Sequence, residues 1–362
     1  MQALHSLFAQ WPDTALAFGG FVIGFAFGAL LSATDYCVMG AISDWRLSGN
    51  MERLGGVAIA AATAIAGAQT LDASGVVDLS YSIYLGTHIN WVGAIGGGLL
   101  FGFGMVYAGG CPSRALVRLG NGDIRGLIVL AVLAIAAYAA ISGVLAGLRV
   151  ALEATTAINV KPAGALTQSL ADIFALAGLS TAPARTFAIA MVLVPLLAFA
   201  GHTAEIFSHP RQLLAGIGVG LLSVAGWLLT GLASDDFATN PLKPASLSFI
   251  RPVADAIDWV ERSTALGLPG FGAATVFGVI AGAFLSSAMS GQIRITAFAD
   301  AGDLKRHLTG ALAMGLGGVL ALGCSIGQGV TGISTLSVQS IIACASIIAG
   351  AVLGLGRLER SL

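Results

Sequence analysis

The sequence predicts an all-α protein that crosses a membrane several times, and three features support this prediction. Hydrophobic residues make up 56% of the 362 residues and charged residues only 10%, which is too few charges to cover a surface facing water. The 50 glycines lie inside apolar runs, as they do in membrane helices. Apolar stretches of about 20 residues, the length that crosses a bilayer, recur along the chain.

Nine such stretches are predicted to be transmembrane helices. They are 15–33, 54–71, 91–109, 124–148, 184–204, 212–232, 271–289, 307–323 and 338–356. The two longer polar connections, 149–183 and 233–268, are predicted to be interfacial, with an amphipathic helix over 254–266. With the N-terminus periplasmic and the C-terminus cytoplasmic, eleven Lys and Arg residues are inside and six outside, as the positive-inside rule requires.

Composition also excludes several classes of function. A net charge of −1 removes the electrostatic basis for nucleic-acid binding. The four cysteines lack the spacing of a zinc module and of a disulfide framework, so neither a metal nor a cofactor is expected. A Walker phosphate-binding motif is absent from the sequence.

Four short segments between the spans are predicted to be re-entrant helices. These segments are 36–45, 112–119, 292–300 and 325–333. They are too short to cross a bilayer but too apolar for ordinary loops, and irregular backbone at membrane depth is tolerated where it lines a cavity.

An internal repeat is predicted within a single transmembrane domain, 1–362. The motif around Gly24 and Gly28 recurs around Gly278 and Gly282, and the Gly110-Cys111 pair recurs as Gly323-Cys324. The predicted repeat halves are 15–125 and 271–337, joined by connecting spans over 124–232. Such repeats with interrupted helices indicate the substrate site of a transporter.

Three of the four cysteines open a predicted re-entrant helix. A helix that begins inside the bilayer directs its free N–H groups at an anion, and a thiol adds a weak donor with a soft sulfur surface. This pattern predicts passage of a small sulfur-containing anion. Buried cysteines often serve packing alone, and Cys344, within a span, is assigned to packing. The candidate substrate-binding residues are Cys37, Cys111, Cys324, Gly110, Gly323, Ser113 and Ser325.

Charged residues near the breaks have two interpretations. The residues concerned either pair within the protein or face water at helix ends; they are Asp35, Asp44, Asp123, Asp300, Arg114 and Arg294. Arg114, three residues after Cys111, is also a candidate for helping to release an anion on the inner side.

The cysteine motifs resemble those of the YeeE/YedE family of sulfur transport proteins. Residues 109–114 read Gly-Gly-Cys-Pro-Ser-Arg, and 323–334 contain Gly-Cys-Ser-Ile-Gly-Gln-Gly. The resemblance implies nine spans with four re-entrant helices, and thiosulfate uptake across the bacterial inner membrane through Cys37, Cys111 and Cys324. It also implies a separate small soluble sulfur-carrier protein as a cytoplasmic partner. The first motif, 35–40, lacks the arginine often found before its cysteine, so another sulfur or selenium species stays an alternative substrate.

Two other functions stay open at this point. A membrane sulfurtransferase would carry a persulfide on Cys111 or Cys324 and would need a thiol of lowered pKa. A channel for neutral solutes would not need the cysteines. A permease, which is not an enzyme, fits the motifs best.

Overall fold

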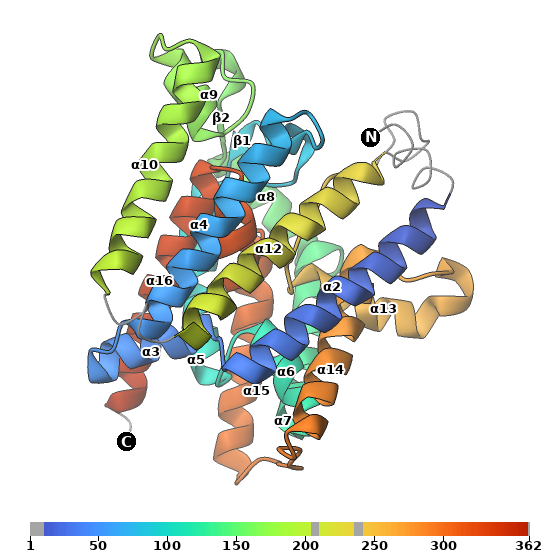
Figure 1. Cartoon of the computed structure of the whole chain (residues 1–362). Coiled ribbons are helices and arrows are strands. Elements are labelled where there is room, and N and C mark those ends of the chain that lie inside the picture. The colour runs from blue at the N-terminus through green and yellow to red at the C-terminus, as the bar shows by residue number, and fades with distance from the viewer. Residues whose placement is uncertain (1–10, 204–209, 235–241, 361–362) are drawn as a thin grey trace.

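The computed structural model describes residues 11–203, 210–234 and 242–360, and helices dominate these residues (Figure 1). One two-stranded antiparallel ribbon joins β1 (His88–Ile89) to β2 (Ile158–Asn159). The principal helices are α2 (Pro12–Thr34), α3 (Val38–Ser48), α4 (Glu52–Ala73), α5 (Gly98–Tyr107), α6 (Pro112–Gly120), α7 (Ile124–Ile141), α8 (Ala146–Thr156), α9 (Leu170–Leu176), α10 (Thr181–His202), α12 (Pro210–Leu232), α13 (Arg251–Leu266), α14 (Phe271–Met289), α15 (Ala301–Leu320) and α16 (Val338–Glu359). Two π-helical segments, η2 (Gly93–Gly97) and η4 (Gly327–Gly332), and two short 3₁₀ turns, η1 (Leu79–Tyr81) and η3 (Lys161–Ala163), complete the element order.

The predicted class, an all-α polytopic membrane protein, is confirmed. Eight helical segments of the described chain are long and apolar enough to cross a membrane. The predicted span 307–323 lies in α15, which is not among these eight because its first turns carry Asp303, Lys305 and Arg306. The crossing of α15 therefore stays a prediction. Residue 204 of the predicted span 184–204 and residues 235–241 of the predicted connection 233–268 lie outside the described residues.

Two predicted boundaries need correction. The predicted span 124–148 is two helices, because the chain leaves helical geometry at Ser142 and α8 begins only at Ala146. The predicted re-entrant helix 292–300 is wrong, since this segment is extended and largely exposed. Its β-branched residues favour extended backbone, and its backbone bonds go to a neighbouring turn: the N–H of Arg294 donates to the Asn121 carbonyl at 3.1 Å.

The other three predicted re-entrant segments are helical. Residues 36–45 fall largely within α3, 112–119 within α6, and 325–333 within a helical run that includes η4. The amphipathic helix predicted over 254–266 is α13, whose apolar face buries Val253, Ala254 and Ala256.

Part of the predicted interfacial connection runs through the protein interior. In the segment 242–250, Leu247, Phe249 and Ile250 are buried in the main core. The Leu247 carbonyl accepts a hydrogen bond from the Thr331 hydroxyl at 2.7 Å, and the Ser246 hydroxyl donates to the Ser223 carbonyl at 2.6 Å. This extended segment therefore holds η4 in place from one side.

Glycines allow α2 and α14 to pack backbone against backbone. A Cβ atom at Gly28 would collide with the carbonyl of Val279, and one at Gly282 would collide with the carbonyl of Phe25. The contacts are thus reciprocal between the two helices, as expected where small residues form helix interfaces in membranes. The division into repeat halves 15–125 and 271–337 stays a prediction.

The same reciprocity joins α5 to α15. A Cβ atom at Gly104 would lie 2.6 Å from the carbonyl oxygen of Gly310, and one at Gly317 would lie 2.6 Å from that of Gly97. The helices that precede Cys111 and Cys324, α5 and α15, are therefore held together at backbone contact.

A Gly28→Ala substitution is expected to destabilise the protein by about 1–3 kcal/mol, the usual range for overpacking. The added methyl group has to displace the backbone of α14, which cannot move as a side chain does. Gly356→Ala is the matched control, because a Cβ atom there meets open space in the last turns of α16. Thermal unfolding of the purified proteins in detergent measures the difference. Equal unfolding temperatures for the two variants would contradict the packing described.

Candidate functional site

The three predicted site cysteines lie at helix breaks of one common geometry. Two residues before each cysteine, the backbone has a positive φ, which ends the preceding helix and turns the chain sharply. These residues are Asp35 (φ 54°), Gly109 (φ 70°) and Leu322 (φ 59°). Left-handed backbone is rare for a leucine and is held only where surrounding packing demands it. Each break therefore places a cysteine at the start of a new helix, as the sequence predicted.

Cys37 is the N-cap residue of α3. Its backbone is extended, and its Sγ accepts a hydrogen bond from the N–H of Gly40 at 3.4 Å. The thiol is half-buried and lies beside the thiol of Cys111. Cys37 thus occupies the edge of the site next to its centre.

Cys111 lies at the centre of the site. It is the N-cap residue of α6, and only 1% of the residue is exposed. Its Sγ is 3.1 Å from the Ser113 hydroxyl and also faces the backbone N–H of Arg114 and the Ser325 side chain. Polar groups from two separate helices thus converge on one sulfur.

Cys324 also lies near Cys111. It is fully buried, and its Sγ accepts a hydrogen bond from the N–H of Gly327 at 3.3 Å. The backbone N–H of Phe249, from the extended segment 242–250, also points at this sulfur, and the Tyr84 side chain is nearby. The electrostatic interaction between Cys324 and Cys111 shows that the structure brings all three cysteines together.

The predicted glycines lie within the same breaks. At Gly110 (φ 156°) a Cβ atom would lie 3.2 Å from the Arg114 side chain, and at Gly323 it would lie 3.3 Å from Gln328. The absence of a Cβ atom therefore lets these side chains pack closely against the main chain next to Cys111 and Cys324. Cys344 lies apart, where its sulfur packs against Gly329.

Tyr36 is a site residue that the sequence analysis missed. It is 2% exposed, and its side chain lies beside Cys37 and Cys111. Its hydroxyl has no hydrogen-bond partner within the described part of the chain. A buried unpaired hydroxyl is costly, which indicates that a ligand pairs with it. The available signal was a tyrosine directly before a cysteine in a helix break.

Comparison with known proteins identifies the family of the chain. The sequence model described as sulphur transport matches residues 33–353, a range that includes all three helix breaks. The chain belongs to the sulphur transport family. It is 24% identical over 355 residues to a protein named thiosulfate transporter TsuA from Escherichia coli (strain K12), covering 93% of each chain. It is 25% identical over 265 residues to a protein of the same name from Spirochaeta thermophila, covering 72% of this chain and 76% of that one.

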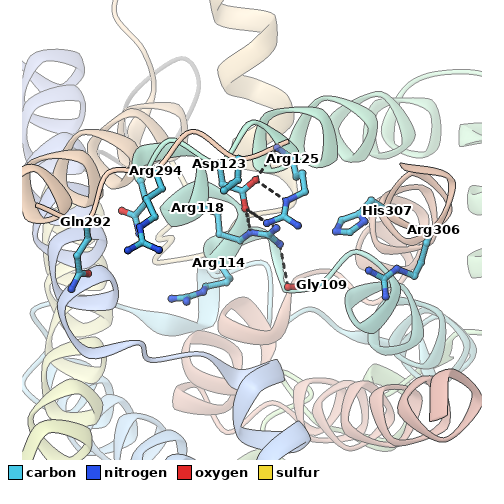
Figure 2. Close-up of a pocket in the computed structure, with 11 residues that line it drawn as sticks. Gly109, Arg114, Arg118, Asp123, Arg125, Gln292, Arg294, Arg306 and His307 are labelled. Atoms are coloured by element: carbon cyan, nitrogen blue, oxygen red, sulfur yellow. Dashed lines mark hydrogen bonds and ion pairs between the residues drawn. The ribbon is translucent and has the colours of Figure 1, made fainter. Parts of the chain in front are cut away.

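This member of the sulphur transport family also has a cationic cleft beside the cysteines. The cleft has a volume of about 510 Å³ and is lined by the turn between α6 and α7, by the segment between α14 and α15, and by Gly109. Figure 2 shows Arg118 and Arg125 converging on Asp123, with Arg118 also reaching Gly109. Burial alone would raise the pKa of Asp123, but the hydrogen bonds from Arg125 and Arg118 outweigh it and lower that pKa to about 2.

Proposed function

We propose that this protein takes up thiosulfate across the bacterial inner membrane, along a pathway lined by the thiols of Cys37, Cys111 and Cys324. The observation that carries the proposal is the convergence of three thiols at helix breaks, with the unpaired hydroxyl of Tyr36 beside them. Family membership and the names of both relatives support it.

The chemistry of the site suits an anion with a terminal sulfur. The first N–H groups of α3 and α6 point toward the thiols and attract negative charge. Thiols are weak, polarizable donors, so they complement the soft sulfur of thiosulfate better than the hard oxygens of sulfate. Ser113 and Ser325 then contact the oxygens in this proposal.

The orientation and the partner form part of the same proposal. We place the N-terminus in the periplasm and the C-terminus in the cytoplasm, because the short segments with most basic residues are then cytoplasmic. The arginine-lined cleft would face the cytoplasm. A small soluble sulfur-carrier protein that consumes thiosulfate there is supported by the family resemblance.

Uptake of ³⁵S-thiosulfate into proteoliposomes tests the proposal. Labelled thiosulfate should accumulate, and unlabelled thiosulfate should compete at lower concentration than sulfate, sulfite or selenite. Equal competition by sulfate would contradict selection by the thiols. Intact-mass measurement after exposure to thiosulfate separates the permease from a sulfurtransferase, because only the latter requires a covalent sulfur adduct on Cys111 or Cys324.

A Cys111→Ser/Cys324→Ser double variant should lose most uptake. Serine has nearly the size of cysteine and also donates, but its hydroxyl is harder and more strongly hydrated. If the S–H contacts matter, each lost contact costs about 1 kcal/mol, which is several-fold in rate, and the two losses multiply. Wild-type uptake with thiosulfate still preferred over sulfate would show that backbone geometry alone selects the anion.

A further inference from the structure

The cationic cleft is lined by more positively charged side chains than carboxylates that could pair with them. Five arginines line it (Arg114, Arg118, Arg125, Arg294 and Arg306), together with His307 and a single carboxylate, Asp123. We refer to these five residues and the space between them as the arginine cleft. Asp123 pairs with two of them, at 2.8 Å from Arg118 and 2.9 Å from Arg125.

Two of the guanidinium groups keep donors that no described residue satisfies. One nitrogen of Arg114 pairs with Asp35 at 3.2 Å, but its Nη1 is buried and unpartnered in the part of the chain that the structure describes. Arg294 forms no ion pair with any described residue, although it lies in a segment pinned to the turn at Asn121. Arg306, by contrast, is paired with Asp303 at 2.8 Å.

The arginine cleft is connected to the thiol site through two contacts. The backbone N–H of Arg114 faces the sulfur of Cys111, while its side chain lines the cleft. Arg118 donates to the carbonyl of Gly109 at 3.3 Å, within the break that precedes Cys111. The arginine cleft and the thiol site therefore share the start of α6, although the cysteines are not among the residues that line the cleft.

The corresponding positions after the other repeated cysteine have no charge. When Cys111 is aligned with Cys324, Arg114 and Arg118 correspond to Gly327 and Thr331. Both of these residues are buried, and Thr331 donates to a backbone carbonyl. At these two positions positive charge therefore follows Cys111 and not Cys324, whereas Arg294 and Arg306 come to the cleft from the other predicted half, 271–337.

We propose that the arginine cleft is a second binding site for a divalent tetrahedral sulfur oxyanion, with Arg294 and the free nitrogen of Arg114 as its main ligands. Guanidinium groups bind such oxyanions through paired charge-assisted hydrogen bonds. The cleft binds thiosulfate and sulfate alike, because it presents N–H donors and no thiol, whereas the thiols select between them. The site's place on the transport path rests on the proposed function; its ability to bind the anion does not.

Equilibrium binding of ³⁵S-thiosulfate to the full-length protein in phosphatidylcholine nanodiscs tests this site. Arg294→Gln should raise the Kd about tenfold, the effect of losing a charge-assisted hydrogen bond. Arg357→Gln is the matched control, since this arginine is exposed near the end of α16 and does not line the cleft. It should leave the Kd unchanged. In a Cys111→Ala background, where the thiol site is impaired, unlabelled sulfate should displace the label at a concentration similar to that of unlabelled thiosulfate.

Further variants and lipids separate this proposal from its alternatives. Cys111→Ala should keep the binding that Arg294→Gln weakens, even where it abolishes uptake. If uptake were independent of the cysteines while Arg294→Gln still lost binding, the proposed function would fail and the arginine cleft would stand. Wild-type affinity in Arg294→Gln, or loss of all binding in Cys111→Ala, would overturn the second site. Displacement of the label by added phosphatidylglycerol would assign the cleft to a lipid phosphate and would also overturn it.

Discussion

Replacing Cys111 or Cys324 by alanine is expected to reduce thiosulfate uptake about ten- to a hundredfold each. Both residues are buried and converge with Ser113, Ser325 and backbone N–H groups. An anion passing the alanine would lose a donor in a place that water cannot refill, and leaving a charged group unsatisfied costs about 1.5–3 kcal/mol, or one to two orders of magnitude in rate. Uptake into proteoliposomes with equal amounts of each variant measures the effect.

Two further cysteine variants calibrate this result. Cys344→Ala should transport at the wild-type rate, because its sulfur packs against Gly329 away from the site. Cys37→Ala should keep part of the activity, since Cys37 is half-buried at the edge of the site and Cys111 lies beside it. Full uptake in the alanine variants of Cys111, Cys324 and Cys37 would show that all three thiols serve packing only.

Replacing Asp123 by alanine is expected to destabilise the protein by about 2–4 kcal/mol. The carboxylate holds two partly buried arginines, and its oxygen also caps α7 by accepting the N–H of Arg125 at 3.1 Å. Removing one partner of such a cluster leaves unpaired charge, and loss of the cap adds about 1 kcal/mol. Asp300→Ala is the matched control, because Asp300 caps α15 in the same way without an arginine partner in the described chain. In thermal unfolding, Asp123→Ala should lose clearly more stability than Asp300→Ala. Similar losses of stability in the two variants would contradict the role of the ion pairs.

The stability lost in Asp123→Ala should also depend on pH. The pKa of Asp123 is lowered to about 2 in the folded protein, from an ordinary value of 3.8. A lowered carboxyl pKa contributes stability that is fully present above the ordinary value and is lost as the pH falls through the folded value. The stability difference between the wild type and Asp123→Ala should therefore be constant from pH 5 to 8 and shrink below pH 4. A difference that grew on acidification would have the wrong sign.

The spans and the cysteine breaks could be predicted from the sequence because both depend on local composition. Apolar stretches of sufficient length have few alternatives to a membrane helix, and Pro112 at the first position of α6 marks a helix start. The prediction failed for 292–300, where glycine flanks suggested a re-entrant helix. There the backbone bonds of Arg294 and Thr296 go to the turn at Asn121 and Ile124, which no local pattern reveals.

The rest of the site depends on contacts between residues far apart in the chain. The segment 242–250 has serines that suggest a surface connection, yet Ser246 is satisfied by Ser223, and Leu247 by Thr331. The positive φ of Leu322 is likewise imposed by packing rather than by residue preference. Arg114 and Arg294 were recognised as charged residues near breaks. Their convergence in one cleft required the three-dimensional structure.

The reciprocal glycine contacts have a consequence for how an anion passes through the protein. Rocking of one repeat against the other is a common route to alternating access, and it requires an interface that can slide. Here α2 meets α14, and α5 meets α15, with carbonyl groups in the place of side chains, so no deformable layer separates the backbones. Tilting either pair would separate closely packed main chains along their length. We therefore expect passage to open by rotation of a few side chains at the cysteine breaks, which makes the barrier a local property of the constriction.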